Sequence, residues 1–231
     1  MCIRDRSATL ERHIEFVSIP NISPDPEQLV INMEWISPYF KNLGFEISLL
    51  KTSTSPVFLE ERIVDKNAKT ILFYFHLYGQ PVDARNWDQK NPFVPVLKKQ
   101  NNNGDWETID LNLLKGKIDS DWRIFARAAA DDKGPITMIL TALEILQQQN
   151  NAPKYNVKIL LDPEEESGSM GFISTLEIYK DRYAADYMII MDGPAHNSNR
   201  PTLTFGCRGI ARCGITLYGS KLPQHLSLIH I

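Results

Sequence analysis

A short, mostly apolar segment that ends abruptly in acids is the feature that most constrains the fold of this chain. Residues 157–161 are followed by Asp162 and by Glu164–Glu166, and then by Ser167–Gly168–Ser169. This pattern is typical of a buried strand whose carboxyl end carries acids into a cleft before a helix begins. Three adjacent glutamates repel one another, so the arrangement is costly unless a cation lies among them. The alternative is a solvated acidic turn.

The composition is that of an ordinary globular protein. Of the 231 residues, 43% are hydrophobic and 23% are charged, and the net charge is −3. These values leave room for one good-sized domain or slightly more, and they lack the basicity of nucleic-acid-binding proteins. No stretch approaches the ~18–20 apolar residues that a membrane span needs. We therefore expect neither nucleic acid nor membrane as a partner.

The first and last six residues differ from the rest of the chain. A DNA string that encodes Met1–Arg6 has a reverse complement that encodes Leu226–Ile231. We therefore expect residues 1–6 and 226–231 to be adapter-derived, and we expect the authentic sequence of residues 7–225 to be a fragment at both ends.

Two cysteines, Cys207 and Cys213, remain once Cys2 is set aside. On one strand they would lie ~20 Å apart, too far for a disulfide. Free thiols are typical of a reducing compartment, so we expect a cytoplasmic protein, although a missing N-terminus leaves a signal peptide undecided.

The apolar periodicity alternates between strands and helices. It predicts helices over 8–18, 27–42, 136–148 and about 170–181, a strand pair over 45–51 and 57–63, and buried strands over 70–76, 157–161 and 187–191. The alternation predicts an α/β fold with a mostly parallel, layered sheet and helices on both faces. The loop-rich residues 77–125 are expected to build the walls of a site. From Pro201 the pattern changes to consecutive strands over 202–205 and 210–218.

Ligand-type side chains follow several of the predicted strands. His76 ends one strand, Glu164–Glu166 follow a second, Asp192 follows a third, and Asp131 precedes a helix. In open α/β sheets, ligands bind at the carboxyl ends of strands. One imidazole with several carboxylates is a set that Zn²⁺ accepts, and a neighbouring glutamate can act as general base on water. Together these signals favour a metal hydrolase over a structural α/β domain with acidic turns.

Five motifs resemble the dinuclear zinc metallopeptidases of family M20, which include carnosinases, glutamate carboxypeptidases and desuccinylases. They are most similar to its bacterial dipeptidase branch, and the resemblance covers essentially all of residues 7–225. The motifs are His76–Val82, Arg127 with Asp131–Pro135, Glu164–Ser169, Asp192, and Pro201–Thr202 with Gly206 and Arg208–Gly209. The resemblance implies the N-terminal part of a catalytic domain over 7–206 and the first strands of a truncated lid or dimerisation domain over 207–225.

The resemblance also implies roles for individual residues. His76 and Asp192 would ligate one metal ion, Asp131 would bridge two, Glu166 would ligate the second, and Glu165 would be the general base. The implied cofactors are two Zn²⁺ ions, with Co²⁺ or Mn²⁺ as alternatives. A cis peptide bond after Asp131 is implied as well.

His225 resembles the family's lid histidine, which reaches across a dimer to stabilise the tetrahedral oxyanion. The resemblance thus implies a homodimer for the full-length protein. The alternative for His225 is a residue at a frayed chain end, and we expect that state in this chain.

Two departures from the family pattern stand out. Tyr78 occupies the position of an aspartate that orients the ligand imidazole, and loss of such support typically costs ~10–100-fold in affinity or activity. Ala126 and Ala128 replace glycines that flank Arg127, which restricts a turn that normally has backbone freedom.

The implied activity is metal-dependent hydrolysis of peptide (amide) bonds in dipeptides or short peptides by a metal-bound hydroxide. Further ligands of the family lie beyond His225, so we expect this fragment itself to be inactive. One alternative is an N-acyl amino acid deacylase or desuccinylase of the same family. Another is a non-catalytic, metal-binding relative.

Overall fold

The computed structural model describes residues 3–23, 25–193, 196, 198, 200, 202–206, 209, 211 and 213–216. The chain divides into two compact units, Met1–Gly193 and Pro194–Ile231. In chain order the elements are α1 (Ile3–Ser18), α2 (Pro26–Asn42), β1 (Glu46–Leu50), β2 (Val57–Arg62), β3 (Thr70–His76), η1 (Ala84–Asn86), β4 (Val96–Gln100), β5 (Trp106–Ile109), η2 (Leu111–Lys115), β6 (Arg123–Phe125), α3 (Lys133–Gln148), β7 (Asn156–Asp162), η3 (Glu165–Ser167), α4 (Met170–Thr175), α5 (Lys180–Tyr183) and β8 (Tyr187–Ile190).

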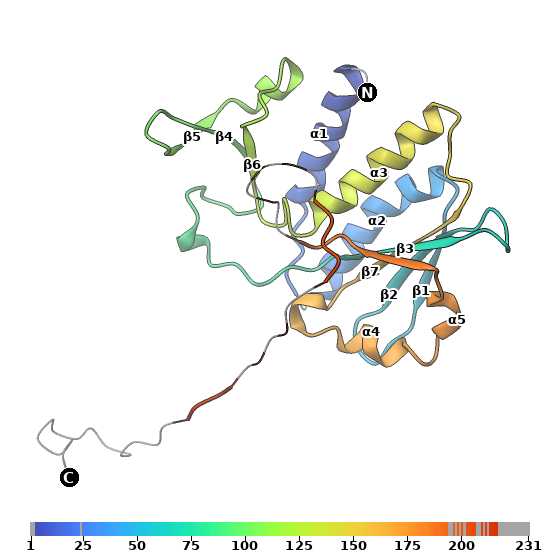
Figure 1. The fold of residues 1–231 in the computed structure, drawn as a ribbon. Coiled ribbons are helices and arrows are strands. Elements are labelled where there is room, and N and C mark those ends of the chain that lie inside the picture. The colour runs from blue at the N-terminus through green and yellow to red at the C-terminus, as the bar shows by residue number, and fades with distance from the viewer. Residues whose placement is uncertain are drawn as a thin grey trace, which may run out of the picture. The chain divides into compact units, whose positions relative to one another are not determined.

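The main sheet has five strands in the order β1-β2-β7-β3-β8 (Figure 1). Strand β3 pairs in parallel with β7 and with β8. Strands β1 and β2 pair antiparallel with each other, and β2 pairs antiparallel with β7. The predicted α/β class is confirmed. The sheet is mixed, because the antiparallel strands β1 and β2 extend its parallel part, β7-β3-β8, on one side.

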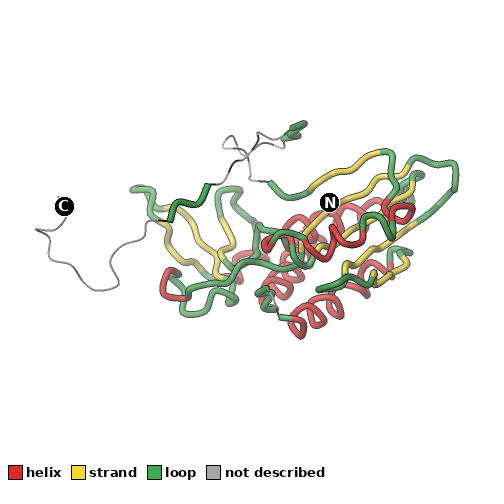
Figure 2. The backbone as a smooth tube through the Cα atoms, turned by 90° about the horizontal axis from the view of Figure 1, so that it is seen from below, coloured by secondary structure: helices red, strands yellow, loops and turns green. Residues whose placement is uncertain are grey.

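Helices cover both faces of this sheet (Figures 1 and 2). Strand β7 is buried at all seven positions, and its successive side chains enter two different cores. Ile159 packs in the core formed with α1, α2 and α3, whereas Leu160 packs in the core that Phe172 of α4 and Tyr183 of α5 border. Burying one such side chain contributes ~1.5–3 kcal/mol, so this strand fixes the centre of the fold.

Three expectations from the sequence need correction. Residues 77–125 contain a second sheet, β5-β4-β6, with antiparallel pairing. The helix expected over 170–181 is two short helices, α4 and α5. Over 202–205, and over the described residues 211 and 213–216 of the stretch 210–218, there is no strand. The polar strands of the second sheet are too short for a clear periodicity, and the residues after 201 have no described partner strand.

The segment set aside at the N-terminus is in part helical, because α1 begins at Ile3. The boundary expected between residues 206 and 207 stays a prediction. In the described part of the chain, no helix combines the length and the apolar character that crossing a membrane requires.

Candidate metal centre

Four of the predicted site residues lie where the parallel strands β3, β7 and β8 end. His76 is the last residue of β3, and its Cα is paired in register with that of Asp162, the last residue of β7. Glu165 and Glu166 follow in η3, and Asp192 lies two residues beyond β8. Parallel strands present their carboxyl ends on one edge of a sheet, which is the reason that these distant residues meet.

The structure brings five of the predicted residues together. His76 Nε2 lies 2.6 Å from Asp131 Oδ1 and 3.9 Å from Asp192 Oδ2. Ligand-type atoms of His76, Asp131 and Glu166 all lie within 4.8 Å of one another, and so do those of His76, Glu165 and Asp192. Such separations are close to those of atoms that bind the same Zn²⁺ at about 2.0–2.2 Å. The residues therefore fit one or two divalent cations.

Two contacts hold His76 in place, one with a main-chain carbonyl and one with a carboxylate. Its Nδ1 lies 2.8 Å from the carbonyl oxygen of Tyr78, and its backbone N–H donates to Asp132 Oδ2 at 3.0 Å. With Nδ1 as the donor to a carbonyl, Nε2 is left to face the acids. Burial lowers the pKa of His76, but the Tyr78 carbonyl and the acids Asp132, Asp131 and Asp192 raise it above its ordinary value.

The three consecutive glutamates have different surroundings. Glu164 is buried and accepts hydrogen bonds from Thr54 Oγ1, Ser55 N and Gly171 N at 2.7, 3.0 and 2.8 Å. Burial raises the pKa of Glu164, but these hydrogen bonds lower it more, and the result is below the usual value. Burial and neighbouring acids instead raise the pKa of Glu165. Glu164 thus supports the fold, and the two later glutamates face the site.

The site has an excess of negative charge. Asp132 is buried, and among the described residues its Oδ1 has no hydrogen-bond partner. Burial raises the pKa of Asp132 to about 8, with Asp192 and Asp131 adding to the effect. Unpaired carboxylates this close together are stabilised by a cation, which favours a metal centre over an acidic turn. His76 is 1% exposed and Asp131 56% exposed, so the centre has a buried wall and an open side.

Tyr78 does not replace the orienting aspartate through its side chain. Its phenol is buried away from His76, where it donates to the carbonyl oxygen of Asp25 and accepts from Leu29 N at the start of α2. The backbone carbonyl of Tyr78 orients the imidazole instead. The phenol therefore takes no part in orienting the imidazole, because its hydroxyl contributes to the first turn of a helix.

The two other local expectations concern the segment before α3. The peptide bond between Asp131 and Asp132 is cis, as the resemblance implies. Ala128 has a φ of 62°, in the left-handed region that favours glycine. Alanine at this position thus adopts a backbone conformation that glycine would adopt more readily.

Other predicted and unpredicted residues complete the site. His225 lies outside the described residues, and its role stays a prediction. No role was predicted for Asp132, or for Gln80 and Arg127, which contact or approach Glu166. A role for Arg127 could have been predicted from the sequence, because a basic residue among alanines next to a predicted acidic site is expected to pair with that site.

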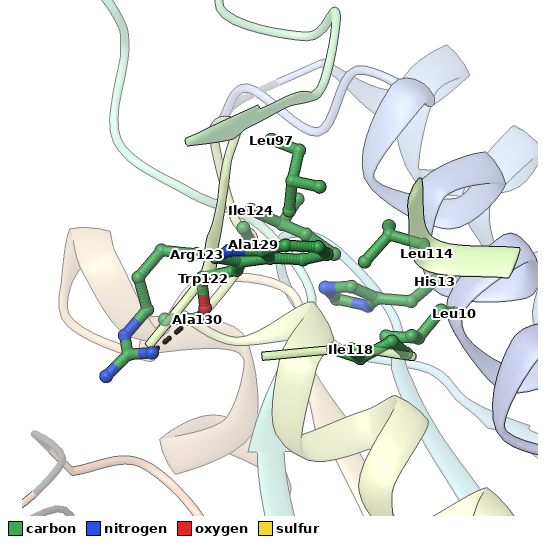
Figure 3. A pocket seen from close by; sticks show the side chains of 10 residues that line it. All are labelled: Leu10, His13, Leu97, Leu114, Ile118, Trp122, Arg123, Ile124, Ala129 and Ala130. Carbon is green, nitrogen blue, oxygen red and sulfur yellow. Dashed lines mark hydrogen bonds between the residues drawn. The ribbon is translucent and has the colours of Figure 1, made fainter. Parts of the chain in front are cut away.

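A separate cavity of about 260 Å³ lies between α1, the second sheet and the segment before Asp131 (Figure 3). His13, Leu97 and Trp122 line it, together with Ala129 and Ala130. His13 Nδ1 lies 3.1 Å from Thr137 Oγ1, and burial lowers the pKa of His13 to about 4. The lining is mostly apolar and includes none of the residues predicted to bind metal.

Comparison with known proteins shows the family of this chain. The sequence profile described as Peptidase family M20/M25/M40 matches residues 73–223, more than half of the 231-residue chain. This chain belongs to Peptidase family M20/M25/M40. The matched range contains His76, Asp131, Glu165, Glu166 and Asp192.

The relatives that this chain matches are longer than the chain itself. The Beta-Ala-His dipeptidase of Homo sapiens is 28% identical over 156 residues, which are 67% of this chain and 26% of that protein. The Cys-Gly metallodipeptidase dug1 of Schizosaccharomyces pombe is 25% identical over 224 residues, 90% of this chain and 43% of that protein. The solved M20 family metallo-carboxypeptidase Sso-CP2 from Sulfolobus solfataricus matches with a TM-score of 0.63 at 30% identity, over 84% of this chain and 39% of that chain. This chain therefore spans less than half the length of these relatives.

Proposed function

We propose that this chain carries the metal centre of a peptidase that hydrolyses dipeptides or short peptides. The observation that carries the proposal is the convergence of His76, Asp131, Glu165, Glu166 and Asp192 within coordinating reach. His76 and Asp192 would hold one cation, Asp131 would bridge two, and Glu166 would hold the second. Zn²⁺ is the proposed ion, since imidazole and carboxylate are ligands that it accepts, and Co²⁺ or Mn²⁺ are substitutes.

Glu165 is the proposed general base. Cations held there would supply Lewis-acid chemistry that polarises the scissile carbonyl and makes water easier to deprotonate. Glu165 takes the proton from the attacking water and gives it to the leaving amine. Its raised pKa, caused first by burial, brings the carboxylate closer to the neutral pH at which a base of this kind works best.

The finer parts of the proposal concern the substrate, the compartment and the assembly of the complete protein. The dipeptidase names of two relatives favour dipeptides as substrates. We place the complete protein in the cytoplasm as a homodimer, in which His225 of one subunit would stabilise the oxyanion of the other. Because this chain spans under half of its relatives, we expect the complete protein to be active and this chain alone to be inactive.

The test is dipeptide hydrolysis by the complete protein with Glu165→Gln, which keeps the shape of the side chain and removes the base. General acid–base catalysis is worth ~10²–10⁴-fold, and kcat should fall by that factor while metal content is retained. Glu177→Gln, at an exposed glutamate, is the matched control and should leave kcat unchanged. An unchanged kcat in Glu165→Gln would remove Glu165 from the mechanism.

The same assay separates the alternative activities. N-acyl and N-succinyl amino acids should be hydrolysed more slowly than dipeptides. If they are hydrolysed faster, the protein is a deacylase or desuccinylase with the same metal centre. Metal uptake without hydrolysis of either substrate would identify a non-catalytic relative.

A further inference from the structure

Arg127 is a half-buried cation at the edge of the metal centre. Its side chain is 20% exposed, and its Nη2 lies 3.9 Å from Oε1 of Glu166. Within the part of the chain that the structure describes, its Nε and Nη2 atoms are shielded from solvent and have no hydrogen-bond partner. A shielded, unpaired ionised group is costly. The guanidinium therefore depends on the neighbouring carboxylate for compensation.

Gly79 makes room for this guanidinium. A Cβ atom at residue 79 would lie 2.8 Å from Nη2 of Arg127 and 3.1 Å from its Nε, which is too close. The main chain of Gly79 is held in place, because its N–H donates to Asn21 O at 2.8 Å and its carbonyl accepts from Ser23 N at 3.1 Å. Arg127 can thus reach Glu166 because residue 79 has no side chain.

Gln80 contacts Glu166 at oxygen atoms other than the one that Arg127 approaches. Its Nε2 donates to the main-chain oxygen of Glu166 at 2.7 Å and to Oε2 at 3.3 Å. One carboxylate oxygen of Glu166 therefore faces Gln80, and the other faces Arg127. A carboxylate held from both sides has less rotamer freedom to lose when it binds an ion together with His76 and Asp131.

We infer that Arg127, packed against Gly79, is a positioning residue that orients the Glu166 carboxylate toward the point it shares with His76 and Asp131. The inference rests on the proposed metal centre and concerns its affinity for cations. A guanidinium also repels a divalent cation, which acts in the opposite direction. The carboxylates of the site outnumber the single guanidinium of Arg127. We therefore expect the orientation of Glu166 to outweigh this repulsion, so that Arg127 strengthens metal binding.

The experiment is a titration of this chain with Co²⁺, followed by calorimetry and by the visible absorption of the bound ion. Arg127→Met should weaken Co²⁺ binding by about tenfold and change the absorption spectrum, as loss of groups that orient ligands does. In the Glu166→Gln background the same substitution should have no further effect. Unchanged or tighter binding, or an equal loss in both backgrounds, would overturn the inference.

Gly79→Ala displaces the guanidinium without removing its charge, and it decides the question if Arg127→Met does not fold. It should weaken Co²⁺ binding in the same direction. Gly116→Ala is the matched control, because its Cβ would meet an ordinary contact 3.6 Å from Leu113 O. If the unchanged chain binds no Co²⁺, the proposed metal centre fails and the inference fails with it. If the unchanged chain, Gly116→Ala and Gly79→Ala all bind equally, only the role of Arg127 fails.

Discussion

The two ends of strands β3 and β7 are built differently. At the amino ends, Asn156 is buried and uses both ends of its amide: Oδ1 accepts from Val64 N and Asp65 N, and Nδ2 donates to Asp65 O, Ala68 O and Thr70 Oγ1. At the carboxyl ends, among the described residues, Asp132 Oδ1 and two nitrogens of Arg127 have no hydrogen-bond partner.

The difference indicates where the fold is stabilised and where the chemistry takes place. Buried polar groups are normally paired, and exceptions within one region require an explanation. The amino ends satisfy their own polar groups, so that region needs no ligand. The carboxyl ends gather acids that a cation would stabilise, so that region would be completed by one.

The largest expected effect is at the carboxyl ends. His76→Asn removes the imidazole, and the affinity for Co²⁺ should fall by at least about 100-fold, more than the loss of an orienting group alone. Calorimetric titration measures it, with His196→Asn, at an exposed histidine, as the control. Equal affinities in the two variants would show that the histidine at the end of β3 is not a ligand.

The matching substitution at the amino ends is Asn156→Ala. It removes several hydrogen bonds that each contribute about 1 kcal/mol, so the free energy of unfolding should fall by about 3 kcal/mol. Denaturant unfolding measures it, and Asn151→Ala, at an exposed asparagine, is the control. The affinity of the folded variant for Co²⁺ should not change, and a parallel loss of affinity would abolish the distinction between the two ends.

Glu60 tests whether a buried, unpaired acid outside the site also affects the affinity for metal. It is fully buried in β2, neither carboxylate oxygen has a partner among the described residues, and burial raises its pKa well above its usual value. The unfolded chain ionises near its ordinary pKa of about 4.5, whereas the folded chain ionises only at higher pH. The contribution of Glu60 to stability is therefore fully present below the unfolded pKa of about 4.5, and it is lost as the pH rises toward the pKa of the folded chain.

Glu60→Gln should remove this loss, making the variant more stable by about 2 kcal/mol at the alkaline end of the range. Unfolding followed at several pH values measures it, with the exposed Glu46→Gln as the control. Affinity for Co²⁺ should stay constant. A change in affinity would mean that unpaired acids do not identify the site.

The smallest effect concerns Ala128, near the site but outside the ligand set. Glycine adopts its φ of 62° without steric cost, so Ala128→Gly should stabilise the chain by about 0.5 kcal/mol after the added flexibility of the unfolded state is counted. Thermal unfolding measures it. A destabilised variant would show that the methyl group contributes more through packing than the backbone conformation costs.

The sequence was sufficient for the parts of the fold that have a local signal. The apolar runs of β3 and β7 predicted buried strands, and the residues after them predicted the site, because strand direction places those ends together. The direction of the Tyr78 side chain could not be predicted, because it depends on contacts with α2. The function of Arg127 depends on the absence of a side chain at the distant Gly79, which no periodicity reveals.

The most direct test is the position of the metal itself. In an anomalous difference map from a crystal of this chain grown with Zn²⁺, we predict density within about 2.0–2.2 Å of His76 Nε2 and of an Asp131 oxygen. Density at an unrelated place, such as the exposed thiol of Cys213, with none beside His76, would contradict the account.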